Sequence, residues 1–389
     1  MNYILFDDSR EKLLPLTFTR PVCELRIGIL TVREKWDAYL NTTSSMLTKD
    51  YLQVKYPLVA TTDNILINGG VCPSLALVEA IVTLNDGERL VKNGKLVATR
   101  IVGNVSEFDA TIIAGREFQG EILTVENPWD IFSKNGLAIE SDFELVTTGR
   151  TSLKLSESNT IIGGGKIFLE EGAKAEACIF NTSSGSIYLG KNTEVMEGSI
   201  IRGPFALCEG SQVKMGAKIY GPTTVGPQSR VGGEVNNSVI IGYSNKGHDG
   251  FLGNSVLGEW CNLGADTNNS NLKNNYDEVR VWSYETQRFA KTGLQFCGLI
   301  MGDHSKSGIN TMFNTGTVVG VSSNVFGSGF PRTFIPSFQW GGAAGFTEYN
   351  KQKAFATVTR VMQRRGKEFD ETEKAILSSV FELTKSSRN

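Results

Sequence analysis

The sequence predicts two fold classes in one chain of 389 residues: an α/β domain at the amino terminus, followed by an all-β parallel β-helix. Two observations support this division. In the first part, short apolar runs alternate with segments of helical periodicity, which is typical of α/β domains. In the second part, aliphatic residues recur at every sixth position, a period that neither an α-helix nor a flat strand produces. The length also exceeds what one ordinary core can hold.

The amino-terminal part contains two predicted strands, two predicted helices and a hairpin. Residues 3–6 and 65–68 are short apolar runs of the kind that form buried strands. Residues 26–40 and 74–84 place apolar side chains three and four positions apart, so each segment can form a helix that covers one face of a sheet. The Asn93–Gly94 dipeptide separates two apolar pairs and predicts a two-residue turn, because both positions tolerate a positive φ.

The six-residue period is the strongest pattern in the chain. Each hexapeptide forms one face of a triangular coil, and its aliphatic side chain points inward and stacks on the same position three hexapeptides later. Buried apolar area therefore accumulates coil by coil. The unbroken run consists of Leu189, Val195, Ile201, Leu207, Val213, Ile219, Val225 and Val231. A shifted phase precedes it at Ile161, Ile167, Ala173 and Ile179, and further phases follow at Leu257, Leu263, Phe313, Val319 and Val325.

Two polar stretches interrupt the period, at residues 242–255 and 268–292. We expect both to leave the solenoid as loops, because loops on a rigid scaffold are where functional residues concentrate. After the last phase the composition becomes helical. A first helix is predicted over 353–365, and Asp370, with Glu373 three residues later, is expected to cap a second one. The predicted domains are 1–150 (α/β), 151–345 (β-helix) and 346–389 (helical tail).

Composition limits the partners. A formal net charge of −2 does not provide the basic field that nucleic acids or anionic membranes require, so neither is expected as a partner. The cysteines lie far apart, with no CxxC pair, and are expected to be buried thiols of a reducing cytoplasm. Residues 1–6 are too short an apolar stretch for a membrane span and do not resemble a signal peptide, so a cytoplasmic protein is predicted. The six cysteines are Cys23, Cys72, Cys178, Cys208, Cys261 and Cys297.

The chain has two histidines, and both lie in the β-helix half. His248 falls in the first polar interruption, where a neutral imidazole can take a proton from a sugar amine or hydroxyl that attacks a thioester. The alternative is an ordinary exposed loop histidine. His304 falls on a regular coil turn and is expected to be structural or to lie at an interface. Of the two, His248 is the candidate base, and from the residues alone both interpretations of it remain open.

The segment from Ser244 to Thr267, SNKGHDGFLGNSVLGEWCNLGADT, resembles the acetyltransferase loop of a known family. This is the bifunctional N-acetylglucosamine-1-phosphate uridylyltransferase and glucosamine-1-phosphate acetyltransferase family. The resemblance implies that His248 is the general base, that Lys246 holds phosphate, and that Asn262 contacts substrate, with backbone N–H groups from Asn262 to Ala265 steadying the oxyanion. It also implies a left-handed coil, acetyl-coenzyme A as donor, and a sugar phosphate or nucleotide sugar as acceptor. A homotrimer with its sites between subunits is expected.

Further family positions match less well. An Asn-Tyr-Asp segment that contacts sugar and acyl donor in the family corresponds to Asn275 and Tyr276 after a four-residue insertion, while Asn271 is a competing match. A family Tyr that lies three residues after the histidine is replaced by Phe251, which removes one hydrogen bond to the substrate. The identity of the sugar is therefore open.

The segment LLPLTFTRP at residues 13–21 resembles the signature of sugar-1-phosphate nucleotidyltransferases, and Thr17 lies in its Pro-Leu-Thr element. Three requirements of that chemistry fail, however. The Gly-rich phosphate turn is replaced by an acidic stretch at residues 6–10, which would repel phosphate. Val22 stands at the place of the signature lysine, and Gly70 at the place of the carboxylate that holds Mg²⁺.

Two interpretations of the amino-terminal domain remain open. It is either a divergent nucleotidyltransferase that uses other residues for phosphate, or a decayed relative retained for sugar binding or packing, which the three failures favour. The candidate phosphate or nucleotide residues are Lys12, Thr17, Arg20, Arg26 and Asn68. The sequence offers no metal ligands, and Mg²⁺ is expected only if the nucleotidyltransferase site is active. The function predicted for the chain is acyl transfer; the alternative is nucleotidyl transfer with the β-helix as a trimerisation scaffold.

Overall fold

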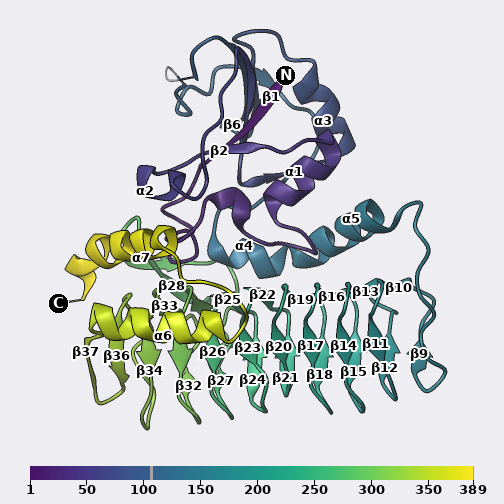
Figure 1. Ribbon diagram of the computed structural model, residues 1–389, viewed down its shortest axis with the longest axis vertical. Helices are drawn as coiled ribbons and strands as arrows, with labels where there is room; N and C mark the ends of the chain where they lie inside the picture. The colour runs from purple at the N-terminus through teal and green to yellow at the C-terminus, as the bar shows by residue number, and fades with distance from the viewer. Residues whose placement is uncertain (106–107, 389) are drawn as a thin grey trace. The chain divides into compact units, whose positions relative to one another are not determined.

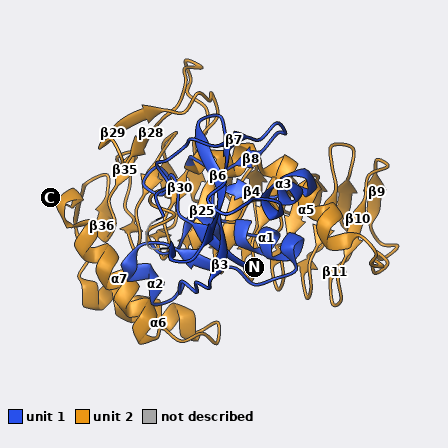
Figure 2. Ribbon diagram, turned by 90° about the horizontal axis from the view of Figure 1, so that it is seen from above, with its two compact units in different colours: residues 1–13, 19–25, 30–127 blue, residues 14–18, 26–29, 128–389 orange. Residues whose placement is uncertain are grey.

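The computed structural model describes residues 1–105 and 108–388 and contains two compact units, coloured separately in Figure 2. The first unit consists of residues 1–13, 19–25 and 30–127, and the second of residues 14–18, 26–29 and 128–389. The predicted fold class is confirmed: an α/β part is followed by a parallel β-helix and a helical tail (Figure 1). The predicted domain limits stay predictions, and the helices α4 (Pro128–Ser133) and α5 (Asn135–Thr147) lie in the second unit.

A six-stranded mixed sheet with strand order β2-β1-β3-β6-β5-β7 forms the first unit. The strands are β1 (Asn2–Phe6), β2 (Ser45–Leu47), β3 (Asp63–Asn68), β5 (Arg89–Lys92), β6 (Lys95–Val102) and β7 (Arg116–Glu117). A separate pair is formed by β4 (Val71–Cys72) and β8 (Leu123–Thr124), and the helices are α1 (Val32–Leu40), α2 (Asp50–Gln53) and α3 (Leu75–Val82). Both predicted strands and the Asn93–Gly94 hairpin are confirmed, with φ of 51° and 73° at the turn.

The predicted helix over 26–40 is wrong in its first six residues. The helix α1 begins at Val32, because the hydroxyl of Thr31 accepts a hydrogen bond from the backbone N–H of Glu34 while the Glu34 side chain accepts one from the N–H of Thr31. This reciprocal cap fixes the start of the helix. Residues 26–29, which precede it, belong to the second unit.

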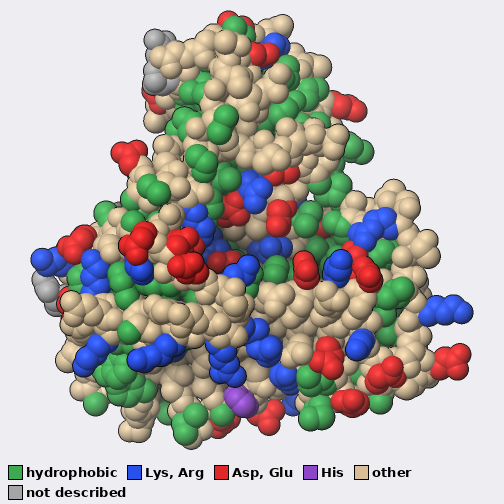
Figure 3. Space-filling model, in the orientation of Figure 1, with side chains coloured by type: hydrophobic (Ala, Val, Ile, Leu, Met, Phe, Trp, Pro, Cys, Tyr) green, Lys and Arg blue, Asp and Glu red, His purple; other side chains and the backbone are tan. Residues whose placement is uncertain are grey.

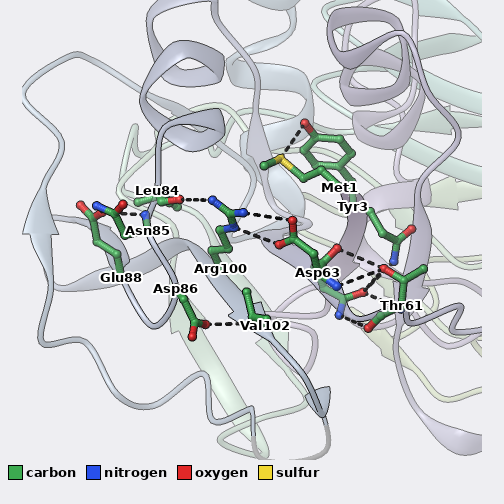
Figure 4. Close-up of polar contacts among 12 residues, drawn as sticks. Met1, Tyr3, Thr61, Asp63, Leu84, Asn85, Asp86, Glu88, Arg100 and Val102 are labelled. Atoms are coloured by element: carbon green, nitrogen blue, oxygen red, sulfur yellow. Dashed lines mark hydrogen bonds and ion pairs between the residues drawn. The ribbon is translucent and has the colours of Figure 1, made fainter.

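An ion pair between Arg100 and Asp63 joins β6 to the neighbouring β3 in the first unit (Figure 4). The guanidinium of Arg100 donates from Nε and Nη2 to the two carboxylate oxygens of Asp63 at 2.9 and 3.0 Å. A third bond, from Nη1 of Arg100 to the carbonyl oxygen of Leu84, ties the strand to the end of α3. The hydrogen bond from Arg100 lowers the pKa of Asp63. Together these bonds hold β3, β6 and the segment after α3 in place.

The second unit is built around three parallel sheets that form the faces of the β-helix. The first sheet contains β10 (Ile167–Leu169), β13 (Ile187–Leu189), β16 (Phe205–Leu207), β19 (Thr223–Val225), β22 (Val239–Gly242), β25 (Val256–Glu259), β30 (Ile300–Met301), β33 (Val318–Val319) and β35 (Phe334–Ile335). The second contains β11 (Lys174–Ala175), β14 (Glu194–Val195), β17 (Gln212–Val213), β20 (Arg230–Val231), β23 (Asn245–Lys246), β26 (Asn262–Leu263), β31 (Lys306–Ser307), β34 (Asn324–Val325), β36 (Gln339–Gly342) and, antiparallel at its end, β37 (Gly345–Glu348). The third contains β9 (Thr160–Ile162), β12 (Ile179–Asn181), β15 (Ile200–Arg202), β18 (Lys218–Tyr220), β21 (Glu234–Asn236) and β24 (Phe251–Gly253), and the pair β27 (Asn268–Asn269) and β32 (Met312–Phe313) continues it.

The predicted stacking of the hexapeptides is confirmed. Leu189 pairs with Leu207, which pairs with Val225, and all three side chains are fully buried. The chain passes from the first sheet to the second and then to the third while it advances, and the views in Figures 1 and 2 show that the coil is left-handed. The later phases are also confirmed, since their five residues belong to the buried core.

The early phase is wrong by one or two residues at Ile167, Ala173 and Ile179. The inward positions are Leu169, Ala175 and Phe180, which pair with Leu189, Val195 and Ile201. Twenty residues separate Leu169 from Leu189, instead of the eighteen of the regular coils, so the inward positions before Leu189 do not continue the phase of the later run. Ile167, Ala173 and Ile179 are only partly buried. Ile161 pairs with Phe180 and stands in the inward row as predicted, although at the end of its sheet it is 55% exposed.

The two interruptions behave differently. Residues 242–255 do not leave the coil, contrary to the prediction: Lys246 pairs with Val231 and Leu252 with Val235, in a coil shortened to fifteen residues between Val231 and Lys246. The second prediction is confirmed. After β27 the chain leaves the solenoid, forms the antiparallel hairpin of β28 (Arg280–Ser283) and β29 (Arg288–Lys291), and returns at β30.

The helical tail is confirmed and consists of α6 (Lys351–Gln363) and α7 (Glu371–Leu383). The predicted cap is present, because the carboxylate of Asp370 accepts a hydrogen bond from the backbone N–H of Glu373 at 2.8 Å. The tail packs on the β-helix through Phe381, whose ring lies 5.0 Å from that of Phe338. Among the described residues, no helix combines the length and the apolar character that crossing a bilayer requires.

Candidate functional site

The largest described cavity of the β-helix is a cleft of about 730 Å³ on the outer face of the second sheet. Strands β17, β20, β23, β26 and β31 and the carboxyl end of α6 form its walls. Its polar and aromatic wall residues are Lys214, Arg230, Tyr243, Asn245, His248, Trp260, Asn262, Lys306, Arg364 and Arg365.

The alternation of side chains along each strand brings these residues to the outer face. Arg230, Asn245, Asn262 and Lys306 pair with one another in consecutive coils, while their strand neighbours, which include Val231 and Leu263, point into the core. Residues far apart in sequence therefore stand one coil apart, at a spacing of about 4.8 Å. The row of outward side chains is a direct result of the six-residue period.

The cleft is strongly basic. Lys214, Arg230, Lys306, Arg364 and Arg365 line it, and no Asp or Glu is among its described wall residues. Burial and the nearby Arg230 lower the pKa of Lys214, and burial, Arg230 and Arg364 lower the pKa of Arg365. Burial also lowers the pKa of Lys306 to about 8. Burial is the main cause of all three shifts, and like charges add to it at Lys214 and Arg365, where an anionic ligand would relieve the repulsion.

The tail supplies two of these cations. Arg364 ends α6, and Arg365 follows it and donates a hydrogen bond from Nη2 to the side-chain oxygen of Asn245 at 3.0 Å. On the face shown in Figure 3, Lys and Arg side chains gather on the β-helix beside α6. The helical tail is thus part of the site as well as a cover for the coil.

Aromatic side chains form one border of the cleft. Tyr243 and Trp260 stand at equivalent corners of successive coils, and their rings stack at 4.3 Å with an interplanar angle of 19°. Both have left-handed backbone conformations, with φ of 52° and 61°. Bulky residues seldom adopt this conformation, and they are usually retained there only when the surrounding structure or a function demands it.

Two of the predicted site residues meet in the cleft. His248 lies on the turn between β23 and β24 with its side chain exposed, and Asn262 begins β26 with its side chain on the outer face. The backbone N–H groups of Asn262 and Gly264 donate to the carbonyl oxygens of Ser305 and Ser307 in the next coil. These two amides are therefore engaged in the coil and do not point toward a substrate oxyanion.

Lys246 lies elsewhere. Its side chain is 2% exposed, points into the coil, and does not line the cleft. Its ammonium donates to the carbonyl oxygen of His248 at 2.6 Å, and burial lowers its pKa to about 8. The structure thus places its side chain on the inner side of the sheet whose outer side carries the cleft, and its role in phosphate binding stays a prediction.

The remaining acyl-donor candidates lie on β24 and in the excursion that follows β27. Phe251 begins β24, with its ring packed over Gly253. Asn275 and Tyr276 lie in the excursion between β27 and β28, where both side chains are exposed, and the competing match Asn271 donates a hydrogen bond to Asn254. None of the four lines the cleft.

The candidate phosphate residues of the amino-terminal part are dispersed. Lys12 is exposed, whereas Arg20 and Asn68 are buried in the first unit. Thr17 and Arg26 are buried in the second unit, where the guanidinium of Arg26 donates to the carbonyl oxygens of Ile29 and Ile241. Of these five residues, only Asn68 lines a described cavity.

That cavity, of about 100 Å³, lies in the first unit, where β1 and β3 end. Asp8, Asn68, Lys92, Lys95 and Glu126 contribute to its wall, and the amide of Asn68 donates to the carboxylate of Asp8 at 3.0 Å. Among the residues that the structure describes, no cluster of three or more His, Cys, Asp or Glu side chains is placed to hold a metal ion.

Asp7 organises the loop that replaces the Gly-rich turn. Its carboxylate accepts hydrogen bonds from the guanidinium of Arg10 at 3.0 Å, the backbone N–H of Val22 at 2.7 Å and the hydroxyl of Thr48. The loop is therefore held by an internal carboxylate, whereas a phosphate-binding turn needs backbone N–H groups that face the ligand.

Sequence reasoning missed most of the cleft. Lys214 and Arg230 flank the inward residues Val213 and Val231, so the hexapeptide register could have identified them as outward cations in adjacent coils. Nothing in the sequence indicated that Arg364 and Arg365 would reach the same place, because the helical tail has no repeat that fixes its position.

Comparisons with known proteins agree with the two-part organisation. Residues 3–151 match a family model described as sugar nucleotidyl transferase. The bifunctional protein GlmU of Methanocaldococcus jannaschii is 28% identical over 208 residues, which cover 54% of this chain and 44% of that protein. A bifunctional sugar-1-phosphate nucleotidylyltransferase/acetyltransferase of Sulfurisphaera tokodaii is 26% identical over 263 residues, 67% of this chain and 57% of the relative. The chain is similar to bifunctional GlmU proteins. The predicted resemblance is confirmed.

The matches to these relatives cover only part of each protein. The chain spans about half the length of the curated relatives it matches. Among solved structures, the polySia specific acetyltransferase NeuO is similar over 54% of this chain and 99% of its own, with 13% identity and a TM-score of 0.23.

Proposed function

We propose that the β-helix carries an acyltransferase that moves an acyl group from acyl-coenzyme A to an amino or hydroxyl group of a sugar phosphate or nucleotide sugar. The observation that carries the proposal is a single cleft that combines the exposed imidazole of His248 with five basic side chains. Both the donor and the acceptor carry phosphates, which such a wall attracts. The name of the Sulfurisphaera relative, which includes acetyltransferase, supports the same chemistry.

The reaction needs one base. The neutral imidazole of His248 accepts a proton from the acceptor amine while the nitrogen attacks the thioester carbonyl. A C–N bond forms, the C–S bond breaks, and the imidazolium returns its proton to the departing thiolate. Arg230 and Lys306 are the wall cations available to offset negative charge on the carbonyl oxygen, and Asn262 is available to orient the acceptor.

The proposal includes a homotrimer. Ile309 and Phe326 stand on neighbouring coils of the second sheet side and are 69% and 39% exposed, and Ile309 lines the cleft. Large apolar side chains beside a polar cleft are typical of a surface that another subunit covers. Sedimentation at several concentrations tests this part: a species of three chain masses is expected, and a monomer at all concentrations would contradict it.

The test of the activity is thiol release from acetyl-coenzyme A with a panel of amino-sugar phosphates and nucleotide sugars. His248→Ala should lower kcat by about 10²–10⁴-fold. His304→Asn is the matched control, because His304 is buried outside the cleft wall and an Asn tolerates its φ of 61°. No turnover by the wild-type protein, or equal turnover by His248→Ala, would refute the acyltransferase.

A second candidate, sugar-1-phosphate nucleotidyl transfer in the first unit, is favoured by the family match over residues 3–151. The residues present do not fit Mg²⁺: Gly70 stands where the metal carboxylate is expected, and the carboxylate of Asp8 accepts from Asn68. Pyrophosphate release from UTP, GTP or dTTP with sugar 1-phosphates and Mg²⁺ is the assay. Activity there would support nucleotidyl transfer, with the β-helix as scaffold if thiol release is absent.

A further inference from the structure

A lysine occupies a position of the coil that elsewhere holds aliphatic residues. Lys246 pairs with Val231 in the preceding coil and stands in the inward row that also contains Val213, Leu263 and Val325. Its side chain is 2% exposed. A buried ammonium costs free energy unless it is hydrogen-bonded, so its retention at this place calls for a specific partner.

That partner is the backbone of the candidate base. The ammonium of Lys246 donates to the carbonyl oxygen of His248 at 2.6 Å, which is the short distance of a charge-assisted hydrogen bond. The carboxylates of Asp249 and Asp266 partly offset the effect of burial on the ammonium, although burial dominates and lowers its pKa to about 8. The bond reaches from the interior of the coil to the turn that carries the imidazole.

The same turn is enclosed by the neighbouring coils. A Cβ atom at Gly233, where φ is +69°, would stand 2.8 Å from the Cα of Asp249 and 2.9 Å from the carbonyl oxygen of His248. On the other side, the backbone N–H of Asp266 donates to the carbonyl oxygen of Asp249 at 3.0 Å. The backbone around His248 is thus fixed from three directions, while its side chain remains exposed.

We propose that Lys246 is a positioning residue for His248: from within the coil, it fixes the peptide plane of His248 so that the imidazole faces the cleft. Lys246 itself contacts no substrate, because its side chain lies on the inner side of the sheet that carries the cleft on its outer side. The inference rests on the proposed acyltransferase function and deepens it. It replaces the phosphate contact that the resemblance implies for this lysine.

The kinetic test replaces Lys246 in the full-length protein. Lys246→Met keeps the length and volume of the side chain but removes the donor, and should lower kcat by about 10–100-fold while KM for donor and acceptor changes less than about twofold. Lys246→Gln retains an N–H donor without the charge and should recover part of that loss. Val325→Ala is the matched control, because it loosens the same inward row away from the cleft wall.

A second measurement does not depend on activity. The chain has two histidines, so the imidazole resonances of His248 can be assigned in labelled protein by comparison with His304→Asn. In Lys246→Met, the His248 signals should broaden or shift, whereas Val325→Ala should leave them unchanged. Gly233→Ala should move the same signals from the opposite side of the turn.

The outcomes separate the two proposals. Thiol release absent from the wild-type protein would refute the acyltransferase, and the His248 resonances would still decide the role of Lys246. Unchanged resonances in Lys246→Met would overturn the positioning role, as would a kcat equal to that of the wild type or a kcat loss no larger than that of Val325→Ala. A large rise in KM with normal kcat would also overturn it, because that is the signature of a substrate contact.

Discussion

The guanidinium of Arg365 donates a 3.0 Å hydrogen bond to the side-chain oxygen of Asn245, which attaches the end of α6 directly to β23. One residue of the helical tail therefore contacts the coil that carries His248. The same guanidinium lines the basic cleft, and its pKa is lowered by burial and by Arg230 and Arg364. A cation held among other cations in this way is available to an anionic ligand.

We predict that Arg365→Ala weakens binding of the donor more than it slows the chemistry. KM for acetyl-coenzyme A should rise about 10-fold or more, since a hydrogen bond to a charged group contributes about 1.5–3 kcal/mol, and kcat should change little. The dependence of KM on salt should become shallower. Lys367→Ala removes the same charge two residues away, at an exposed position outside the cleft wall, and should leave KM near the wild-type value. Equal KM for Arg365→Ala and wild type would show that the tail has no role in binding.

Because of Lys246, the free energy of unfolding should change with pH in the alkaline range. Its pKa in the folded protein is about 8, below its ordinary value of 10.5, so the unfolded state binds more protons between these two values. Stability should therefore rise as pH increases from about 8 to about 10.5 and gain nothing from this group below pH 8. The full shift corresponds to roughly 3 kcal/mol. Urea unfolding at several pH values should show this rise in the wild type relative to Lys246→Met, and parallel curves for the two proteins would contradict it.

At Trp260, replacement by glycine should leave a more stable protein than replacement by alanine, which is the reverse of the usual order. Trp260→Ala removes a buried ring that stacks on Tyr243 and should cost about 3–5 kcal/mol. Because φ is 61° at this corner, Trp260→Gly should be more stable than Trp260→Ala by about 1 kcal/mol, although glycine has the smaller side chain. Trp282, in β28, is the control: its backbone is not left-handed, so there Ala should be the more stable replacement. Denaturant titration gives the free energy of unfolding of the Ala and Gly variants at both positions.

Asp7 should contribute strongly to the stability of the first unit. Its carboxylate is paired with Arg10 and also accepts from the backbone N–H of Val22, so Asp7→Ala removes an ion pair and a hydrogen bond from a largely buried place and should cost about 3 kcal/mol. Glu11→Ala is the comparison, because Glu11 forms an exposed pair with Lys49 at 3.3 Å and its loss should cost less than about 1 kcal/mol. Thermal unfolding followed by circular dichroism distinguishes them. Similar losses for both variants would remove the structural role assigned to Asp7.

Much of the β-helix could be predicted from the sequence because each coil repeats one simple rule. From Leu189 to Val231 every sixth residue is aliphatic, and every one of these side chains is buried. The rule failed where the coil length changed. Two extra residues before Leu189 displaced the early phase, and the shortened coil at Lys246 looked like an ejected loop because a lysine occupies the inward position.

The site was less predictable than the fold because its parts follow different rules. His248 and Asn262 could be identified from a local motif, and both line the cleft. The direction in which Lys246 points depends on the pairing of its strand, and the arrival of Arg365 depends on how a non-repetitive tail packs. Neither is encoded in local spacing. In the second unit, the burial of Arg26 depends on the backbone carbonyl oxygens of Ile29 and Ile241, which the folded chain brings near its guanidinium.

The solenoid also fixes the distances between positions along its axis. Adjacent coils stand about 4.8 Å apart, so positions on the outer face of the second sheet can be separated only by whole multiples of that step. Strand β36, which carries Trp340, lies four strands beyond β23 in this sheet, or about 19 Å along the axis. Insertion or deletion of a complete coil between them would change that reach by one fixed increment. A change in the length of the ligand accommodated on this face would therefore occur in discrete jumps.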